Sequence, residues 1–134
     1  MRAGPTSSPP VLTALREMAR ERPVEVTVRG GCMARVAADG ARVAVAPARL
    51  YWPGDVVVFQ AADGRLLAHR LLGYRLHAGS LACVTRGDGC PCHDAPVPFE
   101  RLLGRVVDLL VPPADRLRAA LACLRLAARR LRSR

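Results

Sequence analysis

The sequence contains no lysine. All 21 basic residues are arginine and stand against 11 acidic residues, which gives a formal net charge of +10. Lysine-based general bases, Schiff bases and phosphate-binding P-loops are therefore excluded. The three histidines are therefore the first candidates for acid–base chemistry near pH 7. Aromatic residues make up only 4%, so the core must rest on valine, leucine and alanine.

Long hydrophobic runs are also missing. The longest, such as residues 106–113, fall far short of the roughly 20 residues that a membrane-spanning helix needs. No secretory signal is recognisable, so the cysteines are expected to be free thiols in a reducing, cytoplasmic compartment. There are five of them: Cys32, Cys83, Cys90, Cys92 and Cys123. A length of 134 residues, 51% of them hydrophobic, predicts one folded domain.

Turn residues divide the middle of the chain into short β-prone runs. Asp63-Gly64, between two apolar runs, is typical of a hairpin turn. The density of such signals predicts a mainly β fold with a compact antiparallel sheet. Strands are expected near residues 41–45, 56–59, 65–72 and 80–85. A flexible tail (1–10) is expected to precede a domain over 11–111, which opens with a short helix at 11–21.

After Pro112-Pro113, residues 112–134 predict a basic amphipathic helix. Apolar residues recur along one face, at Leu117, Leu121, Leu124, Ala128 and Leu131. The default interpretation is that this stripe packs on the β domain. Two alternatives are that the helix lies on an anionic membrane, with the protein peripheral on its inner face, or that it docks a partner protein. A nucleic-acid partner is not expected, because the stacking aromatics and recognition motifs are missing. The sequence does not indicate an oligomeric state.

A thiol follows two glycines in Gly30-Gly31-Cys32-Met33, just after a β-prone run. Glycines allow a sharp turn and the close approach of another group. A cysteine nucleophile needs an imidazole that takes its proton and a third group that orients the imidazole. His69 lies within an apolar strand and is a candidate base, and Asp88 or Asp94 could orient it. From the residues alone, a cysteine after two glycines is more often a small buried hydrophobe than a nucleophile.

Several short motifs follow one another in order within residues 24–107. They are Gly-Gly-Cys32-Met33, Pro53-Gly54-Asp55-Val56-Val57-Val58-Phe59, His69-Arg70, Thr85-Arg86-Gly87-Asp88, Asp94 and Leu103-Gly104-Arg105-Val106. This order resembles type I signal peptidases and, more broadly, the signal peptidase/LexA-like peptidase superfamily. The resemblance implies that Cys32 replaces the nucleophilic serine, His69 is the general base of the histidine branch, and Asp94 completes the site. It also implies supporting roles for Gly30, Gly31, Met33, Asp55, Arg70 and Asp88, without a cofactor or metal.

The function implied by this resemblance is an endopeptidase that cleaves a leader or propeptide from a peptide or protein precursor by a Cys-His-Asp thiol mechanism. Gly30 stands where many members carry a serine that assists the oxyanion, which leaves that task to the Cys32 amide. The alternatives are a catalytically inactive peptide-binding module of the same fold and a peripheral membrane-binding protein. In a separate alternative, the closely spaced Cys90, Cys92 and His93 bind zinc together with Cys83, or the thiols form a redox pair.

Overall fold

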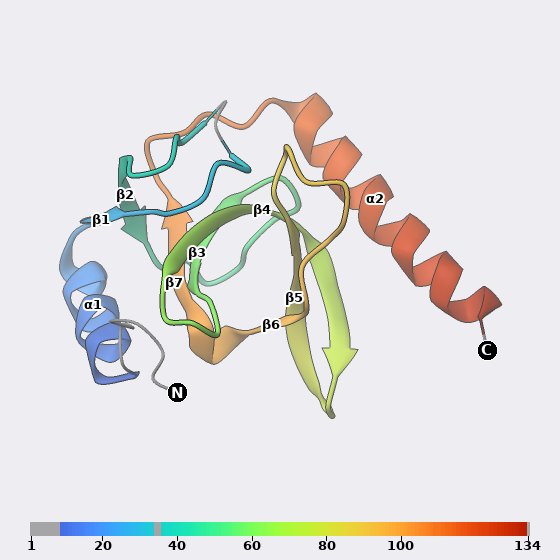
Figure 1. The fold of residues 1–134 in the computed structure, drawn as a ribbon, viewed down its shortest axis with the longest axis horizontal. Coiled ribbons are helices and arrows are strands. Elements are labelled where there is room, and N and C mark those ends of the chain that lie inside the picture. The colour runs from blue at the N-terminus through green and yellow to red at the C-terminus, as the bar shows by residue number, and fades with distance from the viewer. Residues whose placement is uncertain (1–8, 34–35, 134) are drawn as a thin grey trace.

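The computed structural model describes residues 9–33 and 36–133 (Figure 1). Most of the predicted tail lies outside these residues, and the first helix begins two residues before its predicted start. The elements in chain order are α1 (Pro9–Glu21), β1 (Val24–Thr27), β2 (Arg42–Ala46), β3 (Val56–Gln60), β4 (Leu66–His77), β5 (Ser80–Arg86), β6 (Val97–Pro98), a single 3-10 turn η1 (Phe99–Arg101), β7 (Leu102–Val106) and α2 (Pro113–Arg132).

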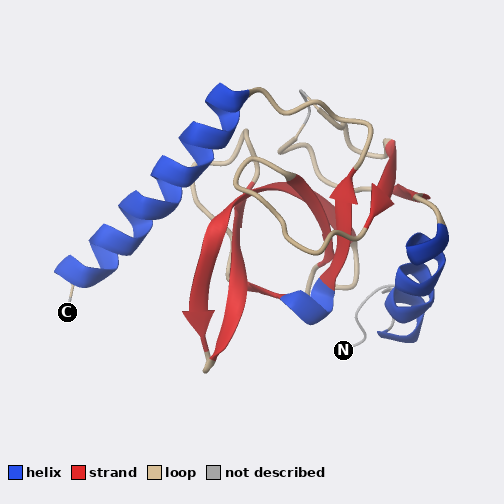
Figure 2. Ribbon diagram, turned by 180° about the vertical axis from the view of Figure 1, so that it is seen from behind, coloured by secondary structure: helices blue, strands red, loops and turns tan. Residues whose placement is uncertain are grey.

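The strands form one antiparallel sheet of seven, in the spatial order β1-β2-β7-β3-β4-β5-β6. The sheet curls into a half-barrel, with α1 and α2 at opposite sides of the molecule (Figures 1 and 2). The predicted mainly β fold with two flanking helices is thus confirmed. The expected hairpin at Asp63-Gly64 joins β3 to β4, where Gly64 adopts a positive φ of 87° that favours glycine.

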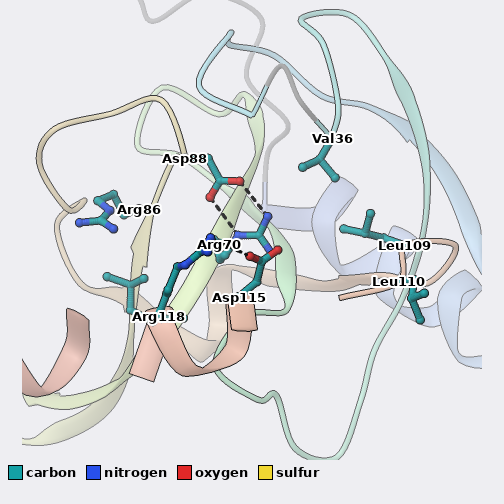
Figure 3. Close-up of a pocket in the computed structure, with 10 residues that line it drawn as sticks. Val36, Arg70, Arg86, Asp88, Leu109, Leu110, Asp115 and Arg118 are labelled. Atoms are coloured by element: carbon teal, nitrogen blue, oxygen red, sulfur yellow. Dashed lines mark hydrogen bonds and ion pairs between the residues drawn. The ribbon is translucent and has the colours of Figure 1, made fainter. Parts of the chain in front are cut away.

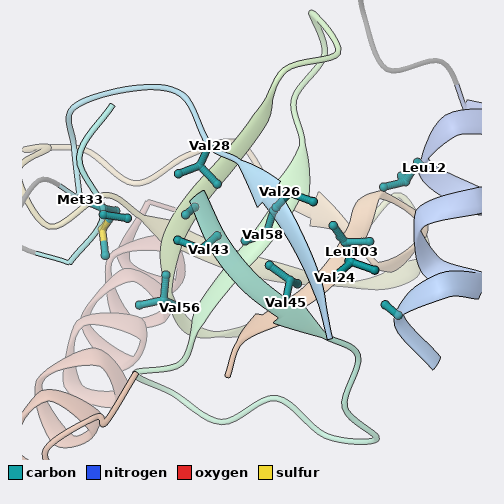
Figure 4. Packing of buried hydrophobic residues seen from close by; sticks show 13 residues of the cluster. Leu12, Val24, Val26, Val28, Met33, Val43, Val45, Val56, Val58 and Leu103 are labelled. Carbon is teal, nitrogen blue, oxygen red and sulfur yellow. The ribbon is translucent and has the colours of Figure 1, made fainter. Parts of the chain in front are cut away.

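The sheet has a buried core on each face. β3 is buried at every position, because its neighbours β4 and β7 flank it and both of its faces are covered. One core lies beneath α1 and includes Val26, Val45, Val56 and Leu103 (Figure 4). The other gathers around Val57, Phe59, Leu71 and Cys83. This double coverage explains why β3 is a continuous run of apolar residues rather than an alternating one.

Helix α2 packs on β4 and β5 through small residues. Ala119, with the partly buried Ala122, Cys123 and Leu126, contacts Leu72 and Val84. The expectation that the leucine stripe faces the β domain is therefore wrong. Leu117, Leu121, Leu124 and Leu131 are between 41% and 73% exposed. Among the described residues, no helix combines the length and the apolar character needed to cross a bilayer.

Candidate active site

His69 lies in the middle of the sheet, on β4 opposite Val57 of β3. Its side chain is only 10% exposed, and its ring meets the ring of Phe59 edge-on at 5.8 Å between centroids. His69 Nδ1 lies 2.5 Å from Asp94 Oδ2. The structure thus brings together the predicted base and the predicted orienting acid, which are 25 residues apart in the chain.

Thr85 holds Asp94 in place from the neighbouring strand β5. The Thr85 hydroxyl donates to Asp94 Oδ2 at 2.7 Å, and the Asp94 amide donates to the Thr85 carbonyl at 2.8 Å. Thr85 is fully buried, so both groups are fixed by the sheet. Burial by itself raises the pKa of Asp94, but the hydrogen bonds from His69 and Thr85 outweigh it and lower the pKa below the usual carboxyl range. Asp94 is therefore ionised at neutral pH.

The ionised carboxylate determines which ring nitrogen of His69 is free to accept a proton. A carboxylate can only accept hydrogen bonds, so a neutral His69 carries its proton on Nδ1 and donates it to Asp94. The lone pair then lies on Nε2, at the opposite side of the ring. This is the tautomer that a general base needs in an imidazole–carboxylate pair.

Cys32 is bonded to Cys90 in a disulfide, with 5.8 Å between the two Cα atoms. The expectation of five free thiols is therefore wrong for these two residues. The loop that carries Cys90 is also held to the Cys32 turn by its backbone, because the Gly89 amide donates to the Cys32 carbonyl at 2.8 Å. Within the described part of the chain, no hydrogen bond joins the Cys32 sulfur to His69.

Two anchors place the Cys32 turn at the same end of β4 as His69. The Arg29 amide donates to the Leu66 carbonyl at 3.0 Å, which fixes the incoming chain beside the first residues of β4. On the other side, Cys32 packs directly on Gly87. Arg86, the last residue of β5, pairs with Arg70, and Gly87 directly follows it in the chain. Cys32 therefore packs against the residue that directly follows β5, near the part of β4 that carries His69.

Two comparisons of the sequence with known proteins found no match. The sequence matches no protein-family model. No curated protein matches it either. The function must be argued from the side chains that the fold brings together.

Arg70 and Asp88, two predicted supporting residues, form a bidentate ion pair. Arg70 Nε and Nη2 donate to Asp88 at 2.9 and 2.7 Å, and Nη1 donates to the Gly54 carbonyl at 2.9 Å. Successive side chains on a strand alternate between faces, so Arg70 points away from His69 and lines a cavity of about 280 Å³ beside α2 (Figure 3). The Asp88 amide donates to Met33 Sδ at 3.1 Å. Together these contacts hold the 87–90 loop between β4 and the Cys32 turn.

The other predicted supporting residues have structural roles. Asp55, whose side chain is 4% exposed, accepts hydrogen bonds from the Trp52 amide and from Arg116 of α2, each at 2.9 Å. It attaches the start of α2 to the sheet and does not contact His69 or Asp94. Gly30 adopts a φ of +93°, a conformation that side chains disfavour, which accounts for glycine at this position. Gly31 has open space around it.

The alternative zinc set is not assembled. Cys90 is bonded to Cys32, Cys92 is exposed, and Cys83 lies in the core, where burial raises the pKa of its thiol to about 12. No group of three or more His, Cys, Asp or Glu side chains within residues 9–33 and 36–133 is arranged to hold a metal ion.

Sequence reasoning assigned no role to Thr85 or Gly87 and considered Cys90 only as a ligand or redox residue. Thr85 and Gly87 both belong to the motif Thr-Arg-Gly-Asp. No pattern in the sequence around Thr85, however, predicts that its hydroxyl donates a hydrogen bond to Asp94. The contact of Gly87 with Cys32 joins segments 55 residues apart, as the nearby Asp88–Met33 hydrogen bond does. The Cys32–Cys90 disulfide was not predicted, because the sequence indicated free thiols.

Proposed function

We propose that this chain is an endopeptidase that removes a leader or propeptide from a precursor, with Cys32 as nucleophile, His69 as general base and Asp94 as the group that orients His69. The single observation that carries the proposal is the His69–Asp94 hydrogen bond of 2.5 Å, buttressed by Thr85, at the end of β4 where the Cys32 turn is anchored. A buried imidazole held by an ionised carboxylate is the base that thiol acyl transfer requires.

The reaction begins when His69 Nε2 takes the proton of the Cys32 thiol. The thiolate attacks the peptide carbonyl, and the bond to nitrogen breaks as His69 returns the proton to the leaving amine. This leaves a thioester on Cys32. His69 then takes a proton from water, the hydroxide attacks the thioester, and Cys32 leaves as the thiolate with the new carboxyl terminus released.

The Cys32 amide is the candidate oxyanion donor. No described residue accepts a hydrogen bond from it, so it is available to the carbonyl oxygen that becomes negative during attack. The positive φ of Gly30 is compatible with glycine and disfavours the serine that supplies a second donor in the resembling peptidases. Loss of one donor costs roughly 10²-fold or more in rate, so slow turnover is expected.

In the oxidised form the nucleophile is masked by the disulfide with Cys90. A dithiol reductant is therefore required: one of its thiolates attacks Cys90 Sγ, and the Cys32–Cys90 bond breaks with its electron pair left on Cys32 as thiolate. The second thiol of the reductant then resolves the mixed disulfide, so that the reductant is oxidised and Cys90 is freed as a thiol. The peptidase is thus active only in the reduced form.

The first test measures iodoacetamide labelling of the reduced protein, read out for each cysteine by peptide mass spectrometry. Cys92 is exposed and serves as an internal reference thiol. Because a free thiol is only a few per cent ionised at pH 7, activation by His69 is expected to make Cys32 react on the order of tenfold faster than Cys92. His69→Ala should remove this preference, whereas the control His77→Ala, at an exposed histidine, should keep it.

The second test incubates the reduced protein with a peptide library prepared from digested bacterial protein and identifies new termini by mass spectrometry. The wild type should generate termini that Cys32→Ala does not. Equal, slow labelling of Cys32 and Cys92 would contradict the proposal, as would identical termini from the wild type and Cys32→Ala.

The disulfide itself favours a second candidate function, in which the domain grips an extended peptide without cleaving it. A chain in which Cys32 stays oxidised has no nucleophile, and β6 is an edge strand, the kind of position at which strand addition occurs. This candidate predicts unchanged peptide binding in Cys32→Ala and no new termini from the reduced wild type.

A further inference from the structure

The leucine stripe of α2, defined as Leu117, Leu121, Leu124 and Leu131, faces away from the rest of the protein. Ala119 and Leu126, which contact the sheet, each follow a stripe leucine by two residues. Two residues correspond to a rotation of about 200° around a helix, so the stripe lies opposite the buried face. The helix runs along one side of the molecule with its last turns directed away from the sheet (Figure 2).

The apolar surface continues beyond the helix onto the loop before β3. Trp52 is 56% exposed and, with Pro53, lines a hollow of about 570 Å³ with Leu117 and Ala120 of α2. The apolar surface formed with the stripe therefore begins at Trp52, which is the only tryptophan in the chain. Exposed apolar surface of this extent, on one side of a charged protein, is typical of an interaction site.

Arginines border one flank of the stripe. Arg118, Arg125 and Arg129 of α2 and Arg86 at the end of β5 line a cavity of about 340 Å³ next to Leu121. Arg118 has a carboxylate 3.4 Å away on Asp115, and within the described residues the other three have no acidic partner. These four guanidinium groups surround one hollow, and among the described residues a nearby carboxylate offsets the charge of only one of them. They therefore provide a site for anionic groups, and arginine binds phosphate particularly well.

We propose that this surface, consisting of Trp52, the leucine stripe and the four arginines, binds an anionic phospholipid bilayer. Leucines side by side with a row of arginines suit an interfacial helix, whose apolar side chains enter the boundary of the acyl chains while the guanidinium groups meet the phosphates. Trp52 at the end of the stripe suits the same depth, because tryptophan favours the membrane–water interface.

The charges argue against a second copy of the chain as the occupant. Antiparallel pairing of two stripes face to face would place the arginine row of one copy next to that of the other, and in any pairing each chain carries a net charge of +10. Like charges at such close range oppose association. A bilayer rich in anionic lipid supplies both the apolar layer and the negative charge that the surface lacks.

Trp52 provides a direct probe of this binding. The full chain is mixed with phosphatidylcholine vesicles, with or without phosphatidylglycerol, and tryptophan emission and cosedimentation are recorded at low and high salt. Emission should shift to the blue only with phosphatidylglycerol, and binding should weaken as salt screens the headgroups. The triple variant Arg118→Gln/Arg125→Gln/Arg129→Gln should bind roughly 100-fold more weakly, the loss expected for three basic residues at an anionic surface.

Matched controls separate this surface from a general charge effect. Arg20→Gln/Arg22→Gln/Arg42→Gln removes the same charge from exposed positions on the α1 and β2 side and should retain most of the binding. Leu121→Gln/Leu124→Gln should abolish the blue shift, whereas Leu76→Gln/Leu81→Gln, at exposed leucines of the β4–β5 hairpin, should not. Circular dichroism checks that each variant is folded.

Three results would overturn the proposal. The first is that both arginine triple variants weaken vesicle binding equally. The second is that the protein binds phosphatidylcholine vesicles as tightly without phosphatidylglycerol as with it. The third is a dimer in analytical ultracentrifugation that Leu124→Gln dissociates. The proposal does not rest on the peptidase function, because Cys32→Ala should bind vesicles as the wild type does. Failure of either proposal is therefore visible without the other.

Discussion

The side chain of Cys32 packs so closely on Gly87 that a Cβ at residue 87 would collide with Cys32 Cβ and lie 3.3 Å from its Sγ. The same Cβ would lie 3.0 Å from Cys90 Sγ. Gly87 is thus the point at which the Cys32 turn and the Cys90 loop meet β5. Gly87 directly follows Arg86, whose partner in the sheet is Arg70, the residue after His69.

Replacement of Gly87 by alanine is expected to displace both sulfur atoms. The variant should form less of the Cys32–Cys90 disulfide on oxidation and should lose about 1–3 kcal/mol of unfolding free energy through overpacking. Non-reducing peptide mapping measures the disulfide, and urea denaturation under reducing conditions measures the stability separately from it.

Gly31→Ala is the matched control for this prediction. A Cβ at residue 31 would have nothing within 4 Å, and its φ is not in the left-handed region. It should therefore leave the stability unchanged or raise it slightly. Equal losses in the two variants would show that the loop tolerates no alanine at all, and the close approach at Gly87 would not be the cause.

Much of the fold could be predicted because turn residues and strand runs carry their information locally. The β3 run and the hairpin at Asp63-Gly64 are examples, since each depends on residues adjacent in the chain. The His69–Asp94 contact was predicted as well, but from a resemblance in the order of motifs and not from local chemistry. Nothing around Asp94 indicates by itself that Thr85 and His69 lie against it.

The orientation of α2 could not be predicted from its leucine stripe. A hydrophobic stripe indicates which face prefers to leave water, but the buried face is selected by how closely the helix can approach the sheet. At Gly73 the sheet comes so near that a Cβ would lie 2.5 Å from Cys123 Sγ. At Gly73 only a small side chain such as Cys123 fits at that distance, and the stripe leucines turn outward while Leu126 packs beside the small residues.

Asp94 is expected to make the stability of the fold depend on pH below neutrality. Its pKa is lowered in the folded state, so the ionised form stabilises the fold, fully above the unfolded carboxyl pKa of about 3.9 and progressively less as the pH falls through the folded value. At pH 7, Asp94→Asn should cost about 1.5–3 kcal/mol, the range for a charged hydrogen bond. Urea denaturation from pH 7 to pH 2 should show the wild type losing its advantage over the variant on acidification.

The exposed Asp108→Asn is the control for this pH series, because Asp108 has no ion pair in the described structure. It should match the wild type at every pH. An advantage of the wild type over Asp94→Asn that persists unchanged at pH 2 would contradict the assignment of this stabilisation to the ionised carboxylate.

The Cys32–Cys90 disulfide closes a loop between residues 58 apart, so it should stabilise the oxidised fold. Cys90→Ser is expected to lower the unfolding free energy by roughly 2–4 kcal/mol relative to the oxidised wild type. The difference should disappear when both proteins are unfolded in the presence of reductant. Cys92→Ser, at an exposed free thiol, should behave as the wild type. Peptide mapping that finds Cys32 bonded to Cys92 would contradict the pairing.

The close approach of Gly73 to Cys123 predicts a paired effect at the junction of β4 and α2. Gly73→Ala should destabilise the protein by about 1–3 kcal/mol, because the new methyl group collides with Cys123 Sγ. Cys123→Ala in the same chain removes that sulfur and leaves a tighter but tolerable contact of 3.1 Å with Cβ, so it should recover most of the loss. A double-mutant cycle by urea denaturation measures the coupling. Additive losses in the cycle would mean that α2 does not dock on β4 through these two residues. The outward orientation of its leucine stripe would then be contradicted as well.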